Sequence, residues 1–164
     1  MAVENEYSAQ HKIAHIDKSG KLTPDTMHGR LRVAYFTHDQ VATGDANSNV
    51  VLARLPAGRV RLLLKASQAY VNWTTSSATM DIGWSAYTDI NGAAVAADPD
   101  GLDDGIDVDT AGYQIFGSTS LTAIDALGGT YLFESQDGVD IIATSTTATG
   151  IGDDIAGYLT YVID

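Results

Sequence analysis

The chain lacks cysteine altogether and contains only three glutamates, Glu4, Glu6 and Glu134. Without cysteine, disulfide bridges and thiolate metal ligands are excluded. The longest strongly apolar run, Leu62–Leu64, is far shorter than the roughly 20 apolar residues of a membrane-spanning helix. The first twelve residues also lack the apolar core of a signal peptide. We therefore expect a soluble chain that is made in the cytoplasm and has no membrane partner.

Basic residues are absent from the second half of the chain. All nine lysines and arginines fall between Lys12 and Lys65, and fifteen of the 21 acidic residues follow Lys65. Residues 1–65 carry nine positive and six negative charges, a net of +3, and the remaining −15 gives the total of −12. Phosphate binding depends on clustered Lys and Arg, so an acidic body argues against nucleic acid as a direct partner. A basic sub-surface remains available for an acidic protein.

The length of 164 residues fits one folded domain. Residues 1–28 are polar and poorly patterned, so we expect an N-terminal arm followed by a domain over residues 29–164. One interpretation of the arm is a disordered terminus with at most a short helix over Ala9–Ile16. The other is that Tyr7, Ile13 and Ile16 anchor the arm on a partner and fold on binding.

Short stretches in which apolar and polar residues alternate predict β-strands along most of the domain. Val60, Leu62 and Leu64 are expected to face a core, with Arg59 and Arg61 opposite. The predicted strands are Arg30–Thr37, Val50–Leu55, Arg59–Ala66, Gln68–Thr74, Ala78–Ala86, a strand around Tyr113–Phe116, Thr130–Glu134, Val139–Thr146 and Ile155–Ile163. In the first of these, Leu31, Val33 and Tyr35 lie on one face and Arg30 and Arg32 on the other.

Between two of these strands, Asp89–Asp109 is rich in small and acidic residues with several turn signals. We expect this segment to be an exposed crossover between two sheets. Ser120–Leu127 is the one internal helix candidate, with Ser120 as N-cap and a Gly-Gly stop. Since no helices separate the strands, the pattern favours an all-β fold. We predict an antiparallel β-sandwich of jelly-roll form.

No motif in the chain points to catalysis, a cofactor or a metal. The acidic segment does not fit an EF-hand, because Leu102, Asp103 and Asp109 stand where an oxygen ligand, a glycine and a glutamate are needed. A solvated loop is expected there, with a calcium site of another kind as the alternative. His11 and His15 share the spacing of two metal ligands on a helix, but Lys12 replaces the glutamate of the zinc-protease motif. We expect a protein that is not an enzyme.

The segments AYTDINGAAVAADPDGLDDGIDVDTAG, FESQDGVDI and GYLTYVID resemble the small capsid decoration (cement) proteins of tailed bacteriophages. The resemblance covers roughly Val50–Asp164 and rests on the sequences of loops and strands, not on catalytic residues. It implies a structural protein on the outside of an assembled head, bound to the major capsid protein, commonly as trimers around local three-fold positions. In that role it would reinforce the capsid lattice against the pressure of packaged DNA.

Charge and pattern together suggest how such a protein attaches. The cations beside the early strands are expected to project from the outer face of a sheet and, with the arm, to form one basic surface. The candidate capsid-binding residues are Tyr7, Ile13, Ile16, Arg30, Arg32, Arg54, Arg59, Arg61 and Lys65. The alternative is a glycan- or receptor-binding domain of a tail or fibre protein, with Trp73, Trp84, Tyr87 and Tyr113 as a sugar-binding platform.

Overall fold

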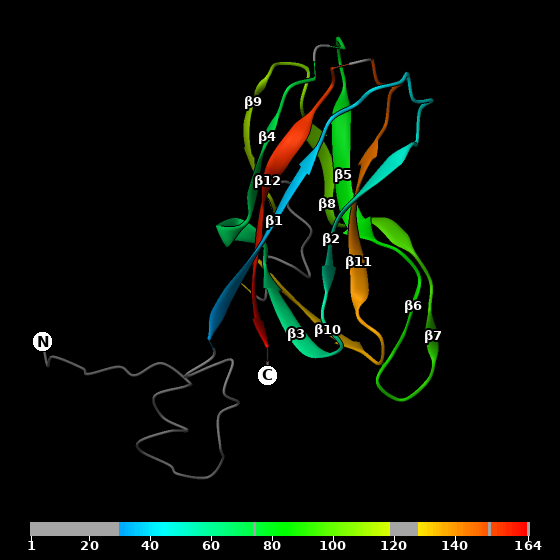
Figure 1. The fold of residues 1–164 in the computed structure, drawn as a ribbon, viewed down its shortest axis with the longest axis vertical. Coiled ribbons are helices and arrows are strands. Elements are labelled where there is room, and N and C mark those ends of the chain that lie inside the picture. Colours follow the sequence, from blue (N-terminus) through cyan, green and yellow to red (C-terminus); the bar gives the residue numbers. More distant parts are fainter. Residues whose placement is uncertain (1–29, 74, 119–127, 151, 164) are drawn as a thin grey trace, which may run out of the picture.

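The computed structural model describes residues 30–73, 75–118, 128–150 and 152–163. Their structure is an antiparallel β-sandwich, as predicted, in which a six-stranded and a four-stranded sheet pack face to face (Figure 1). The elements are β1 (Leu31–His38), β2 (Asn49–Leu55), β3 (Gly58–Leu63), the 3₁₀ turn η2 (Leu64–Ala66), β4 (Gln68–Val71), β5 (Thr79–Trp84), β6 (Tyr87–Thr88), β7 (Ala94–Val95), β8 (Asp98–Asp107), β9 (Gly112–Ile115), β10 (Thr130–Ser135), β11 (Val139–Ser145) and β12 (Ile155–Ile163). The jelly-roll form stays a prediction. The predicted arm and the helix candidate Ser120–Leu127 lie outside the described residues.

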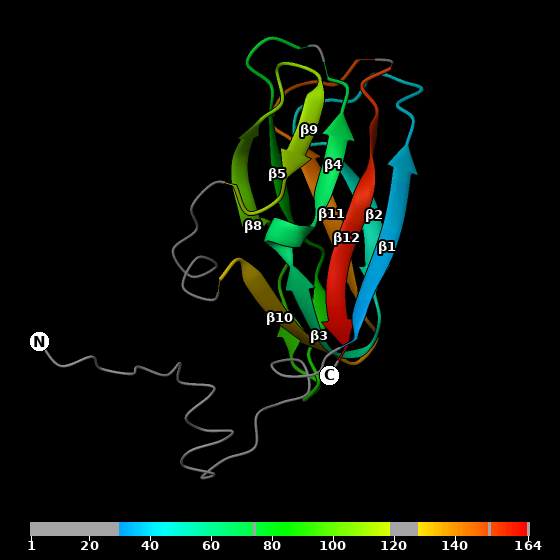
Figure 2. The same ribbon diagram turned by 90° about the vertical axis from the view of Figure 1, so that its left-hand side faces the viewer.

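The two sheets are built around different central strands. In the four-stranded sheet the order is β2-β11-β5-β8, and the β6–β7 hairpin lies beyond it. In the six-stranded sheet β12 pairs with β1 along one edge. The other edge of β12 has two partners. The N-terminal half of β12 pairs with β4, and the C-terminal half pairs with β3. β9 then adds to β4, and β10 adds to β3 (Figure 2).

The core lies between the sheets and follows the alternation expected from the sequence. Val60, Leu62 and Leu64 are fully buried, as predicted, and so are the core-facing residues of β5. Completely burying an aliphatic side chain of this size stabilises the fold by about 1.5–3 kcal/mol. Aromatic rings close one part of the core, where Trp84 and Tyr131 both pack on Phe133 with ring centroids 5.5 and 4.7 Å away.

The acidic segment after β5 differs from the prediction. Instead of an exposed crossover it contains the ten-residue edge strand β8, which pairs with β5 in the same sheet. Leu102 and Ile106 are buried, and Asp103 is buried as well. Two irregularities in the β5–β8 register break the period-two pattern, which is why the alternation is not visible in the sequence. Charged side chains on an edge strand also discourage pairing with other chains.

Strand β1 also departs from expectation. Its register with β12 places Ala34 opposite Leu159 and Phe36 opposite Gly157, on the core side. Leu31, Val33 and Tyr35 therefore point outward, with 59, 43 and 80% of their surface exposed. We expected the cations of β1 to project from the outer face of the sheet. This was wrong, because Leu31, Val33 and Tyr35 project from that face instead.

A single side chain bridges the point where the partner of β12 changes from β3 to β4. The Ser67 hydroxyl donates to the carbonyl of Leu63 at 2.8 Å and accepts the backbone N–H of Thr160 at 2.8 Å. Ser67 and Thr160 are both buried. The Thr160 hydroxyl donates in turn to the carbonyl of Ala66 at 2.7 Å. Because no β-ladder bond reaches Thr160 N–H from this side, the Ser67 hydroxyl substitutes for one.

We predict that Ser67→Ala lowers the free energy of unfolding by about 1–3 kcal/mol, because it leaves the buried N–H of Thr160 without an acceptor. Urea denaturation followed by tryptophan fluorescence measures this change. Ser76→Ala is the matched control, since Ser76 is exposed and the same substitution there should change stability by less than about 0.5 kcal/mol. Equal effects of the two substitutions would contradict the bridging role.

Candidate interaction surfaces

Five of the six described cations gather at one end of the sandwich, the end where β1 begins and β12 ends. Arg61 and Leu31 flank Val162 on opposite sides of β12, and Arg32 lies opposite Tyr161. Arg30 precedes β1, while Arg54 and Arg59 flank the turn from β2 to β3. We call Arg30, Arg32, Arg54, Arg59 and Arg61 the arginine end. Residues 1–29 join the domain here, directly before Arg30.

Acidic neighbours balance part of this charge. The Arg54 guanidinium binds both carboxylate oxygens of Asp140 at 3.0 Å and donates to the Asp137 carbonyl at 2.9 Å. Arg59 pairs with Glu134 across the β3–β10 ladder at 3.0 Å. Exposed ion pairs of this kind contribute at most about 1 kcal/mol, so they leave these side chains accessible to another partner.

The other predicted capsid-binding residues lie elsewhere. Lys65 is in η2, apart from the arginine end, and its aliphatic stem packs close to Gly129. Tyr7, Ile13 and Ile16 lie outside the described residues. The structure thus brings together the five predicted arginines but not the predicted lysine.

A second surface was not foreseen from the sequence. It is the outer face of β1, β12, β4 and β9, which lie side by side in Figure 2. In antiparallel pairs, residues directly opposite each other project on the same side, so the register identifies its members. We call it the uncharged sheet face, and it consists of Leu31, Val33, Tyr35, Thr37, Gln68, Tyr70, Tyr113, Ile115, Ala156, Tyr158, Thr160 and Val162.

None of these twelve residues is charged, in a chain whose net charge is −12. Tyr35, Tyr113 and Ile115 are 80, 73 and 53% exposed. Tyr35 packs edge-on against Tyr158 with ring centroids 6.1 Å apart, and Tyr70 packs similarly on Tyr113 at 5.2 Å. Protein-binding surfaces are enriched in tyrosine and depleted of charge at their centres. The composition of this face is that of a protein interface.

The face is hollowed on its β1 side. A groove of about 440 Å³ runs between β1 and η2, with β12 as its floor. Leu31, Val33 and Tyr35 form one wall, and Ala66 forms part of the other. One sequence signal for the face did exist, because residues 156–163 of β12 contain no charged side chain. A strand that is uncharged on both sides is typical of one covered on both faces.

The predicted sugar-binding platform is not assembled. Trp73 and Trp84 are buried, and their indole N–H groups donate to the carbonyls of Asp153 and Ala96. Tyr87 packs edge-on against Phe133. Of the four predicted residues only Tyr113 is well exposed, and it belongs to the uncharged sheet face. This proposed glycan site was wrong because alternating strand aromatics fill the core here.

A cavity of about 160 Å³ lies at the end of the sandwich opposite the arginine end, and its lining includes His38, Ser145 and Asp153. These side chains do not form a nucleophile–base pair. His38 Nε2 bonds to Gln40 at 2.9 Å, and the Ser145 hydroxyl donates to the Thr147 carbonyl. A carboxylate oxygen of Asp153 accepts the N–H of Gly150. Each polar group is thus engaged in ordering the local loops.

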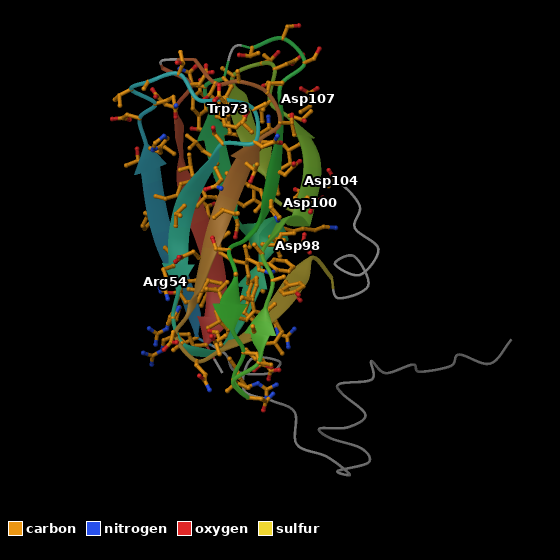
Figure 3. All side chains as sticks on the ribbon, turned by 90° about the vertical axis from the view of Figure 1, so that its right-hand side faces the viewer. Arg54, Trp73, Asp98, Asp100, Asp104 and Asp107 are labelled. Atoms are coloured by element: carbon orange, nitrogen blue, oxygen red, sulfur yellow. The ribbon has the colours of Figure 1, made fainter. Side chains whose placement is uncertain are left out.

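Carboxylates line the β8 edge of the four-stranded sheet. Figure 3 shows Asp98, Asp100 and Asp104 along β8, with Arg54 nearer one end of the molecule and Asp107 nearer the other. Burial raises the pKa of Asp98, and its hydrogen bond with the Asp100 side chain raises that pKa further. Burial also raises the pKa of Asp81, whose carboxylate accepts the N–H of Gly105 at 2.8 Å. Ionisation of Asp98 and Asp81 at neutral pH therefore lowers the stability of the folded chain.

Among the described residues, no group of three or more His, Asp or Glu side chains is arranged to hold a metal ion. His11 and His15 lie outside them. The described part of the chain also contains no helix that is long and apolar enough to span a membrane.

No protein-family model matches the sequence, and neither does any curated protein. Several solved structures of viral capsids are similar in part. The chain shares 11% identity with VP2 of the infectious bursal disease virus subviral particle, with a TM-score of 0.47 over 84% of this chain, and spans about a third (33%) of that protein. A chain of the cyanophage Pam1 capsid shares 12% identity with a TM-score of 0.47, covering 90% of this chain and 96% of that one. A capsid chain of the Helicobacter pylori bacteriophage KHP30 shares 10% identity with a TM-score of 0.35, covering 82% of this chain and 94% of that one. All three TM-scores are below 0.5.

We predict that Asp98→Asn raises the thermal midpoint at pH 7, because it removes a carboxylate whose folded-state pKa is raised. For such a group the stabilising contribution is present below the ordinary pKa of 3.8 and is lost as pH rises through the higher folded-state value. The advantage of the variant over wild type should therefore be largest at neutral pH and shrink as the pH falls below 3.8, where the carboxyl group becomes protonated in both states.

Scanning calorimetry between pH 3.5 and pH 7 measures this difference. Asp39→Asn is the control, because it removes the same charge from an exposed residue outside the acidic edge. If Asp39→Asn raises the midpoint at pH 7 as much as Asp98→Asn does, then general charge repulsion, and not the local environment of Asp98, explains the effect.

Proposed function

We propose that this protein is a structural virion component that binds the outer surface of a phage head and stabilises the capsid lattice. The observation that carries the proposal is the arginine end. In a chain of net charge −12, five of the six described cations lie at the single end of the sandwich where residues 1–29 join the domain. The resemblance of three segments to capsid decoration proteins supports the same role.

The proposed attachment is end-on. The arginine end faces acidic groups of the major capsid protein, and Tyr7, Ile13 and Ile16 of the arm add apolar anchors. Lys65 is left out of the attachment surface, because it lies apart from the arginines. The acidic β8 edge then faces away from the shell or toward solvent, where its charge keeps finished particles apart. Trimers around local three-fold positions, as the resemblance implies, are part of this proposal.

The experiment that tests this function is addition of the purified protein to undecorated heads of the phage that encodes it. Saturable binding at a fixed number of copies per head is expected, together with a higher temperature of DNA release. Because long-range attraction between opposite charges is screened by salt, binding should weaken as ionic strength rises. Binding that does not saturate, or heads that release DNA at an unchanged temperature, would contradict the proposal.

We predict that Arg32→Glu weakens binding to heads about five-fold at low salt, since exposed charge contacts contribute about 1 kcal/mol each. Arg32 is exposed and forms no ion pair with another described residue. Lys65→Glu is the matched control, because it changes the net charge equally outside the arginine end. Similar affinities of the two variants would show that only overall charge matters.

Removal of residues 1–20 should cost more than Arg32→Glu, because it takes away apolar anchors as well as charge. The measurement is again occupancy of undecorated heads over a range of salt, with circular dichroism to check that the shortened chain is folded. If the shortened chain and Arg32→Glu both saturate the heads at wild-type concentrations, neither the arm nor the arginine end is the attachment surface.

A further inference from the structure

We propose that the uncharged sheet face is a contact between two copies of this chain. A second copy fits the face for an electrostatic reason. Two molecules of net charge −12 repel each other, and the acidic β8 edge concentrates that repulsion on the other sheet. The twelve residues of the uncharged sheet face place no like charges opposite each other, and the nearest cation in its rows is Arg61, which follows Val162 at the border of the face.

The shape of the face is also self-complementary. The groove lies on its β1 side, and Tyr113 and Ile115 are exposed on β9. The strands β1 and β9 lie at opposite sides of this face (Figure 2). A two-fold axis parallel to the strands, between β12 and β4, places β9 of each copy over β1 of the other. Ile115 lies in the same cross-strand row as Tyr35, through Gln68 and Tyr158. Each copy therefore brings its projecting residues to the groove of the other, as an isologous contact requires.

The size of the face sets the expected strength. Strand spacing and rise give roughly 400 Å² of sheet per copy, so the two copies together bury about 800 Å². That is below the roughly 1,200 Å² at which specific complexes become stable, and it corresponds to weak association. We expect the purified chain to self-associate in solution with a dissociation constant in the micromolar range. It becomes effective when copies are held close together, because a high local concentration drives a weak contact.

The proposal concerns the purified chain in solution and does not depend on attachment to a head. Sedimentation velocity over a concentration series measures the association. Tyr113→Glu should weaken it at least ten-fold, since it places a charge at a desolvated contact. Val41→Glu is the matched control, because Val41 is 82% exposed and lies outside the face. Added salt should strengthen the contact by screening repulsion, the opposite of its expected effect on binding to heads.

Disulfide trapping with introduced cysteines tests the orientation of the two copies. The chain has no natural cysteine, so any disulfide must join the introduced positions. A Tyr35→Cys chain mixed with an Ile115→Cys chain should form a disulfide-linked dimer under mild oxidation, because the two-fold contact brings these positions together. A Val41→Cys chain mixed with the Ile115→Cys chain should not. A chain that stays monomeric up to about 1 mM, or equal association of the Tyr113→Glu and Val41→Glu variants, would overturn the proposal. So would a Tyr113→Glu variant that self-associates normally but no longer binds heads.

Discussion

Strand β12 is the element on which the rest of the structure depends. It pairs with β1 from Ile155 to Val162 and with β3 and β4 on its other edge, so three strands are held in register by one. The change of partner from β3 to β4 interrupts the ladder, and the Ser67 hydroxyl closes that gap. Gly157 allows β4 to lie close, since a Cβ there would be 2.2 Å from the Gln68 carbonyl oxygen. The inner face of β12 belongs to the core and its outer face to the uncharged sheet face.

Charge is segregated between different parts of the molecule. The acidic groups of β8 lie at the edge of the four-stranded sheet, the arginines lie at one end of the sandwich, and the outer face of the six-stranded sheet carries neither across β1, β12, β4 and β9. Burial and the neighbouring Asp100 raise the pKa of Asp98, so the ionised form of Asp98 reduces the stability of the fold at neutral pH. Residues that reduce stability in this way are often retained for solubility or for interaction.

Much of the fold was predictable from alternation alone, because strands that bury one face keep a period of two. The bounds of β12 and the buried faces of β3 and β5 follow the pattern directly. β8 was missed because register irregularities break the alternation and because Asp and Gly are uncommon in strands. The predicted orientation of β1 was wrong because both faces of this strand carry apolar residues. Only the pairing with β12 decides which face meets the core.

The uncharged sheet face could not be predicted for a related reason. Tyr35, Tyr113 and Tyr158 are far apart in sequence, and only the strand order places them on one surface. That surface runs along the side of the sandwich, whereas the arginine end lies at one tip of the long axis (Figures 1 and 2). A molecule that attaches by its tip necessarily turns its side toward its neighbours. Attachment and lateral contact can therefore occur together, and a side contact too weak to hold in dilute solution gains strength once attachment has concentrated the copies on one surface.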